Sequence, residues 1–104
     1  MRITYGVVWR EGDAPLSRGK LELLPLTVRL DGVTGSTHTA REIPYEELAA
    51  VRIGRSEGER LDGRPTVVLE LVSGARVVVA SVAQSGIAAE LVERLTSATL
   101  GAAG

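Results

Sequence analysis

The chain has 104 residues, no cysteine, and twelve basic against thirteen acidic side chains, which gives a formal net charge of −1. The missing cysteines exclude disulfides and thiolate metal sites. The near-neutral charge argues against nucleic-acid binding, which draws most of its affinity from a strongly basic face. The length suits a single domain with one core. No apolar run is long enough to cross a bilayer, and the first residues lack the features of a signal peptide, so we expect a cytoplasmic protein.

The first half of the chain predicts antiparallel strands, because apolar and polar residues alternate through it. In residues 2–10 this alternation places Tyr5, Val7 and Trp9 on one face. Trp9 is either core or an exposed anchor, and the core is the commoner place for an aromatic on such a face. The apolar phase changes at Pro25, which predicts a tight turn there. Residues 31–36 (DGVTGS) predict a hairpin loop, followed by a polar strand over residues 37–43.

Residues 41–55, REIPYEELAAVRIGR, predict a turn from Pro44 to Leu48. A strand is expected from residue 50 onward, with Val51 and Ile53 facing inward and Arg52 facing outward. The adjacent glutamates at positions 46 and 47 raise the possibility of an acid–base pair. Adjacent positions rarely face one site, so we expect both carboxylates to lie in water on the turn.

The segment after residue 55 predicts a polar loop over residues 56–64, whose charges we expect to pair with one another, and then a hairpin over residues 66–81. The hairpin turn is placed at Ser73 and Gly74. Glu70, in the middle of the first strand of this hairpin, either faces solvent or pairs with Arg76 across the hairpin. We favour the pair and assign Glu70 no chemistry.

A C-terminal helix is predicted by Ile87, Leu91 and Leu95, which recur at four-residue spacing and form one apolar face. Ser85 is a candidate cap at the start of this helix, Ser81 with Gln84 offers an earlier start, and Gly101 is expected to end it. The predicted domain therefore covers residues 1–100, and residues 101–104 are expected to be a flexible tail.

Seven strands followed by one amphipathic C-terminal helix resemble the pleckstrin-homology (PH) superfold. The segments GKLEL, TVRLDG, REIPYEELAAVRIGR, LDGRPTVVLELVSGARVVVASV and AAELVERL are similar to those of small bacterial PH-like proteins. The resemblance implies a mainly β fold, a seven-stranded antiparallel bent sandwich or barrel capped by one helix. The C-terminal helix lacks the tryptophan usual in eukaryotic PH domains, which places the chain in the wider PH-like group, where fold does not determine function.

The resemblance also directs attention to the first loop, WREGDAPLSRGKLEL. Lipid-binding PH domains carry basic residues at the end of the first strand and the start of the second, and Arg10, Arg18 and Lys20 occupy such positions here. Several cations aimed at one phosphate would bind an anionic head group. Glu11 and Asp13 lie in the same loop, however, and this mixture of signs favours an ordinary solvated loop.

The sequence contains no catalytic constellation. His38 is the only histidine, so we expect neither a metal site nor a pair of histidines for acid–base work. No serine-nucleophile elbow and no phosphate-binding glycine loop is present. We therefore predict that the chain is not an enzyme and uses no cofactor or metal.

Two binding functions follow from these observations. The first is a noncatalytic interaction module that binds a protein partner or a second copy of the chain, because a polar edge strand such as Thr37–Ile43 can accept an added strand. The alternative is weak binding of a phospholipid or inositol phosphate head group through Arg10, Arg18 and Lys20. Neither nucleic acid nor a transmembrane segment is expected.

Overall fold

The structure, a computed structural model, describes residues 3–54, 61, 64–82 and 87–103. It contains seven strands and one α-helix in these residues, as predicted. The elements are β1 (Ile3–Glu11), β2 (Ser17–Leu23), β3 (Thr27–Thr34), β4 (Thr37–Pro44), the 3-10 helix η1 (Tyr45–Glu47), β5 (Leu48–Gly54), β6 (Thr66–Leu71), β7 (Arg76–Ser81) and α1 (Ile87–Ala103).

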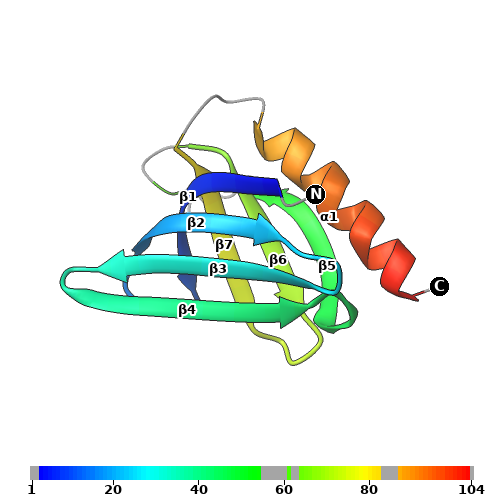
Figure 1. Cartoon of the computed structure of the whole chain (residues 1–104), viewed down its shortest axis with the longest axis horizontal. Coiled ribbons are helices and arrows are strands. Elements are labelled where there is room, and N and C mark those ends of the chain that lie inside the picture. Colours follow the sequence, from blue (N-terminus) through cyan, green and yellow to red (C-terminus); the bar gives the residue numbers. More distant parts are fainter. Residues whose placement is uncertain (1–2, 55–60, 62–63, 83–86, 104) are drawn as a thin grey trace.

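All seven strands form one antiparallel sheet in the order β4-β3-β2-β1-β7-β6-β5. The strand β1 joins its two halves, because residues 3–9 pair with β2 while residues 7–11 pair with β7. The sheet curls strongly, and β4 and β5 lie at its two margins, joined by η1 (Figure 1). The fold is thus a curled, barrel-like sheet with one C-terminal helix, which confirms the predicted mainly β class.

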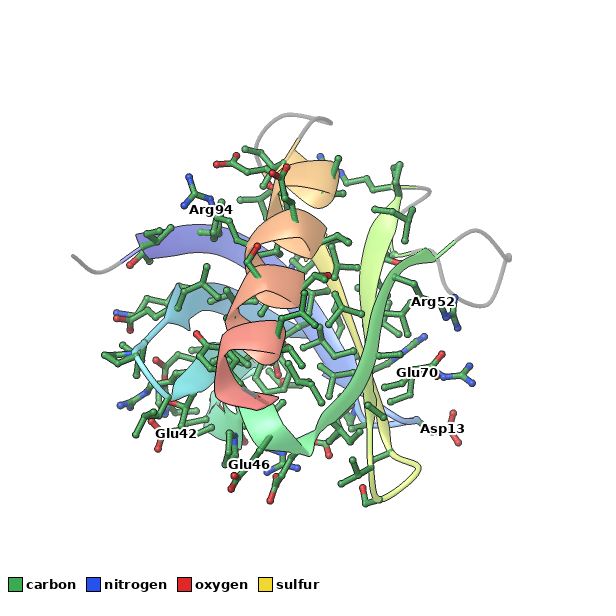
Figure 2. The ribbon with its side chains drawn as sticks, turned by 90° about the vertical axis from the view of Figure 1, so that its right-hand side faces the viewer. Asp13, Glu42, Glu46, Arg52, Glu70 and Arg94 are labelled. Atoms are coloured by element: carbon green, nitrogen blue, oxygen red, sulfur yellow. The ribbon has the colours of Figure 1, made fainter. Side chains whose placement is uncertain are left out.

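The core lies on the concave side of the sheet, and α1 packs over it against β5 and η1 (Figure 2). Leu91 and Leu95 of the helix are fully buried there, and Trp9 is buried as predicted. Burying one such leucine contributes roughly 1.5–3 kcal/mol. The buried apolar residues of this core are Val7, Trp9, Leu21, Val28, Leu30, Ile43, Tyr45, Leu48, Val67, Leu69, Leu71, Val77, Val79, Ala88, Leu91 and Leu95.

A second, smaller apolar cluster covers part of the convex side. It consists of Val8, Leu61, Val78 and Ala80, with Leu16 packed against it. Strict alternation predicts polar residues on this side of β1 and β7, so the cluster was not expected from the sequence. It forms because Leu61, in a segment predicted to be only a polar loop, lies over the centre of the sheet; most of residues 56–64 lie outside the described residues.

One of two predicted turns is present as expected, and the other has different bounds in the structure. The predicted turn at Pro25 is present, with the Leu24 backbone N–H donating to the Thr27 carbonyl at 2.9 Å. The predicted loop over residues 31–36 is wrong, because β3 extends to Thr34 and the loop contains only Gly35 and Ser36. Gly35 has φ +60°, which permits a two-residue hairpin loop, so the strand can continue up to it.

Trp9 explains why residues 31 and 32 belong to β3. Its indole N–H donates to the backbone carbonyl of Asp31 at 3.1 Å. The ring lies against Gly32, where an added Cβ would come within 2.9 Å of Nε1. Aspartate and glycine resemble turn residues in the sequence, but here they let an aromatic side chain approach the backbone of a strand closely.

Two further predictions concern the two ends of α1. The helix continues to Ala103, two residues beyond the end predicted at Gly101. Alanine has the highest helix propensity, so residues 102 and 103 extend the helix past the glycine. The proposed cap Ser85 lies outside the described residues, whereas Ser81, the alternative start, is the last residue of β7.

Predictions for β5 and β6 are confirmed in part. Val51 and Ile53 pack against the core, and the turn before β5 is η1. Glu70 lies opposite Arg76 in the β6–β7 register, and its carboxylate accepts a hydrogen bond from Arg52 Nε at 2.8 Å. Arg52 and Glu70 lie on the side of the sheet that faces away from α1 (Figure 2).

Candidate functional site

The outer edge of β4 is the first component of the candidate site. In the sheet β4 pairs with β3 on one side only, and in Figure 1 it lies at the margin opposite α1. The Tyr45 backbone N–H donates to the Leu26 carbonyl at 3.1 Å, which continues the β3–β4 register beyond Pro44. Because hydrogen-bonded positions alternate along an antiparallel pair, the odd-numbered residues of β4 bond to β3. The backbone N–H and C=O groups of the even-numbered residues therefore face outward.

Three residues of β4 have such outward-facing backbone groups, namely His38, Ala40 and Glu42. All three side chains are exposed on the convex side. The next even-numbered residue is Pro44, which has no N–H group and so ends the usable edge. The edge thus offers three donors and three acceptors in a regular strand conformation.

The second component is a hollow of about 380 Å³ on the concave side, beside this edge. Trp9 lines it from β1, and Thr39 and Arg41 line it from β4. Its remaining lining residues are Glu11, Ala14, Pro15, Ser17, Thr34, Thr37 and Ala40. Two of its hydroxyls already have partners, since Ser17 Oγ and Thr34 Oγ1 lie 2.7 Å apart and Thr34 also donates to the Leu16 carbonyl. The hollow is therefore a mixed apolar and hydroxyl-lined recess that reaches the free edge of the sheet.

An ion pair connects the edge strand to β1 beside this hollow. Arg41 Nε donates to Glu11 Oε1 at 3.0 Å, and both side chains are about one-third exposed. The pair brings a residue of the sheet margin to the end of the strand at the sheet centre. Both members of the pair line the hollow.

The sequence-predicted residues Arg10, Arg18 and Lys20 all lie on the convex side of the β1–β2 hairpin. Arg18 is exposed opposite Val8, and the Lys20 ammonium pairs with Glu22 at 3.3 Å. Arg18 and Lys20 therefore follow one another on the same face of β2, whereas Arg10 pairs with β7.

Arg10 belongs to a different hollow, of about 350 Å³, between the β1–β2 and β6–β7 turns. Arg76 and Asp13 line the same recess. The Nε atom of Arg10 is buried, and no acceptor among the described residues hydrogen-bonds to it. The three predicted cations thus share one face, but only Arg10 lines a recess.

The hollow beside β4 was not predicted from the sequence. Its residues come from positions 9–17 and 34–41, and only the curl of the sheet brings them together. The available signal was the run Thr37, Thr39 and Arg41 on the inward face of β4, because polar residues on both faces of a strand are unusual beside a core. His38, predicted to be exposed, is exposed.

Tyr45 and Tyr5 have shifted pKa values, and neither residue lines the hollow beside β4. Burial raises the pKa of Tyr45, and its hydroxyl donates to the Leu24 carbonyl at 2.7 Å. Burial also raises the pKa of Tyr5, which lies near Arg94 and Glu90 of the helix.

In the described part of the chain, no three histidine or carboxylate side chains gather to hold a metal ion. The helix that the structure describes is too short or too polar to cross a membrane.

Comparisons with known proteins identify a shared fold but no family. No family model matches the chain, and no curated protein matches it. Among solved structures, it is similar to the crystal structure of the C-terminal domain of an unknown protein from Leishmania infantum, with a TM-score of 0.68 and 16% identity. The match covers 94% of this chain and 82% of that one. A likeness of this kind establishes a shared fold.

Proposed function

We propose that this chain is a noncatalytic PH-like interaction module of the cytoplasm, which binds a protein segment by adding it as a strand to β4. The observation that carries this proposal is the free edge formed by His38, Ala40 and Glu42 beside a hollow. Strand addition draws its affinity from main-chain hydrogen bonds and its specificity from pockets for alternate side chains. Both parts are present in β4 and the hollow.

The other margin of the sheet is less suited to this role. The helix α1 packs against β5 and η1, so an incoming strand at β5 would lie beside the helix. Native edge strands are often guarded by lysine, by proline or by inward-pointing charges. The edge of β4 carries no lysine, and its inward Arg41 is already neutralised by Glu11. Its one proline, Pro44, lies at the end of the strand.

An added strand would meet different chemistry on its two faces. Side chains directed to the concave side would lie over Thr39 and Arg41 at the rim of the hollow. Those directed to the convex side would lie beside His38 and Glu42. The geometry therefore favours an extended segment with an uncharged hydrogen-bonding side chain toward Arg41, whose Nη groups can donate to it.

The test uses extended peptides selected on the whole chain from a random displayed library, each then titrated into isotope-labelled protein. We expect the amide shifts to centre on His38, Ala40 and Glu42. Ala40→Pro removes an outward N–H that β3 does not use, so this variant should fold and lose the peptide. Ala40→Val keeps that N–H and is the matched control. Peptides that bind elsewhere, or bind Ala40→Pro as well as the control, would refute the proposal.

A second candidate function is binding of an anionic head group at the β1–β2 hairpin. It is supported by the common face of Arg10, Arg18 and Lys20 and by the recess that Arg10 shares with Arg76. Vesicles containing an anionic phospholipid should then bind the chain at low salt and release it as salt increases. Binding that survives Arg18→Ala combined with Lys20→Ala would exclude this site.

A further inference from the structure

The edge of β4 is complementary to a second copy of itself. We infer that its partner is another β4, paired antiparallel across a two-fold axis at Ala40. This inference rests on the proposed use of β4 as an interaction edge and names the partner. It is drawn from the pattern of free backbone groups and from the side chains that each possible register brings together.

Backbone geometry selects one register. In an antiparallel pair, the free N–H and C=O groups of one strand must meet those of the other, so His38, Ala40 and Glu42 must pair among themselves. With the axis at Ala40, all three find partners, because Ala40 meets its own copy and His38 meets Glu42 in both directions. That arrangement forms about six hydrogen bonds. A shift of the axis to any other residue of β4 leaves at least one free position opposite Ser36 or Pro44.

The side chains favour the same register on the convex face. The imidazole of His38 can donate to the carboxylate of Glu42 of the other copy, and symmetry makes this contact twice. Glu42 accepts only one hydrogen bond from a described residue, from Thr27 Oγ1 at 3.2 Å, and a carboxylate has further acceptor capacity. The uncharged side chain of Ala40 lies on the axis, opposite that of the other copy.

Competing registers bring like charges together. An axis at Arg41 would set its guanidinium opposite that of the other copy, and an axis at Glu42 would oppose two carboxylates. Like charges directly opposite one another destabilise a strand pair. With the axis at Ala40, Arg41 instead lies opposite Thr39 of the other copy, on the side of the hollow. The side chains on both faces of the strand thus disfavour registers that would also leave backbone groups unpaired.

The interface is small, which limits the affinity of the dimer. The pair spans residues 37–43 of each copy and ends at Pro44, which cannot donate a hydrogen bond. Stable protein interfaces bury about 1,200–2,000 Å² in total, and one strand pair provides less than this. The dimer should therefore form at high protein concentration and dissociate on dilution.

Single cysteines test the register directly, because the chain has none of its own. Directly opposed hydrogen-bonded residues have Cα atoms about 5.5 Å apart, within the range of a disulfide. Ala40→Cys should therefore cross-link to itself under oxidation. His38→Cys and Glu42→Cys should cross-link when mixed and not separately, because each position lies about 14 Å from its own copy.

Light scattering across a concentration series supplies the second measurement. We expect the wild-type mass to rise from one chain to two, and Ala40→Pro to raise the dissociation constant at least about tenfold, with Ala40→Val as control. A single-chain mass at millimolar concentration, or cross-linking of His38→Cys alone as readily as the mixture, would overturn the inference. If selected peptides bind β4 while the mass stays at one chain, only this inference fails; if neither occurs, the proposed function fails with it.

Discussion

Arg41 on β4 and Glu11 on β1 are thirty residues apart in the chain, yet Nε of the one donates to Oε1 of the other at 3.0 Å. The contact links the free margin of the sheet to its central strand. Its Glu11 end also lies between two recesses, because Glu11 lines the hollow beside β4 on one face of β1 and Arg10, the residue before it, lines the other recess on the opposite face. The ion pair therefore adds a side-chain contact to the backbone pairing with β3 that holds the edge strand beside the hollow.

We predict that Glu11→Gln lowers the free energy of unfolding by about 0.2–1 kcal/mol, the range of partly exposed ion pairs. A double-mutant cycle with Arg41→Met, measured by urea unfolding, should give a coupling energy of that size, and high salt should reduce it. Glu90→Gln provides the comparison, because its pair with Arg94 lies within α1 at i,i+4 spacing. A coupling energy of zero between Glu11 and Arg41 would show that the contact does not hold β4 in place.

Gly32→Ala should be strongly destabilising. The added Cβ would come within 2.8 Å of Ser17 Cβ and 2.9 Å of Trp9 Nε1, so the indole must move and its hydrogen bond to Asp31 must lengthen. Overpacking of this kind costs about 1–3 kcal/mol. Because Trp9 is the only tryptophan, its fluorescence reports both the unfolding curve and the change in its surroundings. Gly6→Ala meets only one flexible methyl, of Val82 at 3.1 Å, and should cost clearly less.

Stability should fall in alkaline solution because folding raises the pKa of Tyr45. Burial raises the pKa of Tyr45 above its usual value of about 10, so the unfolded chain loses this proton first. The contribution is complete below about pH 10 and is lost as the pH rises through the pKa of the folded state. Tyr45→Phe should therefore flatten the decline of unfolding free energy above about pH 10. An unchanged decline in Tyr45→Phe would assign the effect to other groups, including Tyr5.

Exchanging the charges of β4 tests the contacts across the proposed two-fold axis. His38→Glu places a carboxylate opposite Glu42 of the other copy, twice by symmetry, and should weaken self-association about two- to thirty-fold. Adding Glu42→Lys to the same chain restores opposite charges and should restore the dimer. Sedimentation equilibrium measures both, with Glu46→Lys on η1 as the control. A double variant that remains as weak as His38→Glu would contradict this register.

The strands and the helix could be predicted from the sequence because their apolar residues follow the period of each element. Leu91 and Leu95 recur at helical spacing, and Val7 and Trp9 alternate along β1, so their buried positions follow from local pattern. The extension of β3 through Asp31 and Gly32 could not be predicted in this way. Those residues resemble a turn, and their role as the surface on which Trp9 packs depends on a contact 22 residues distant.

The candidate site was only partly predictable for the same reason. The sequence indicated that residues 37–43 form a polar edge strand, and β4 is indeed at the margin of the sheet. The hollow beside it depends on the curl that brings Arg41 to Glu11, and local pattern carries no information about that curl. The grouping of Arg10, Arg18 and Lys20 came from a family resemblance. The structure places the three side chains on one face of the sheet, and of the three only Arg10 lines a recess.

Amide NMR tests most directly whether β4 binds protein, as we propose. Unlabelled protein is added to the isotope-labelled chain up to millimolar concentration, with Ala40→Pro as the unlabelled control. We predict shifts centred on the amides of His38, Ala40 and Glu42 with wild-type protein and not with the control. Shifts centred instead on Arg18 and Lys20, or an unchanged spectrum at β4 both here and with selected peptides, would contradict the account.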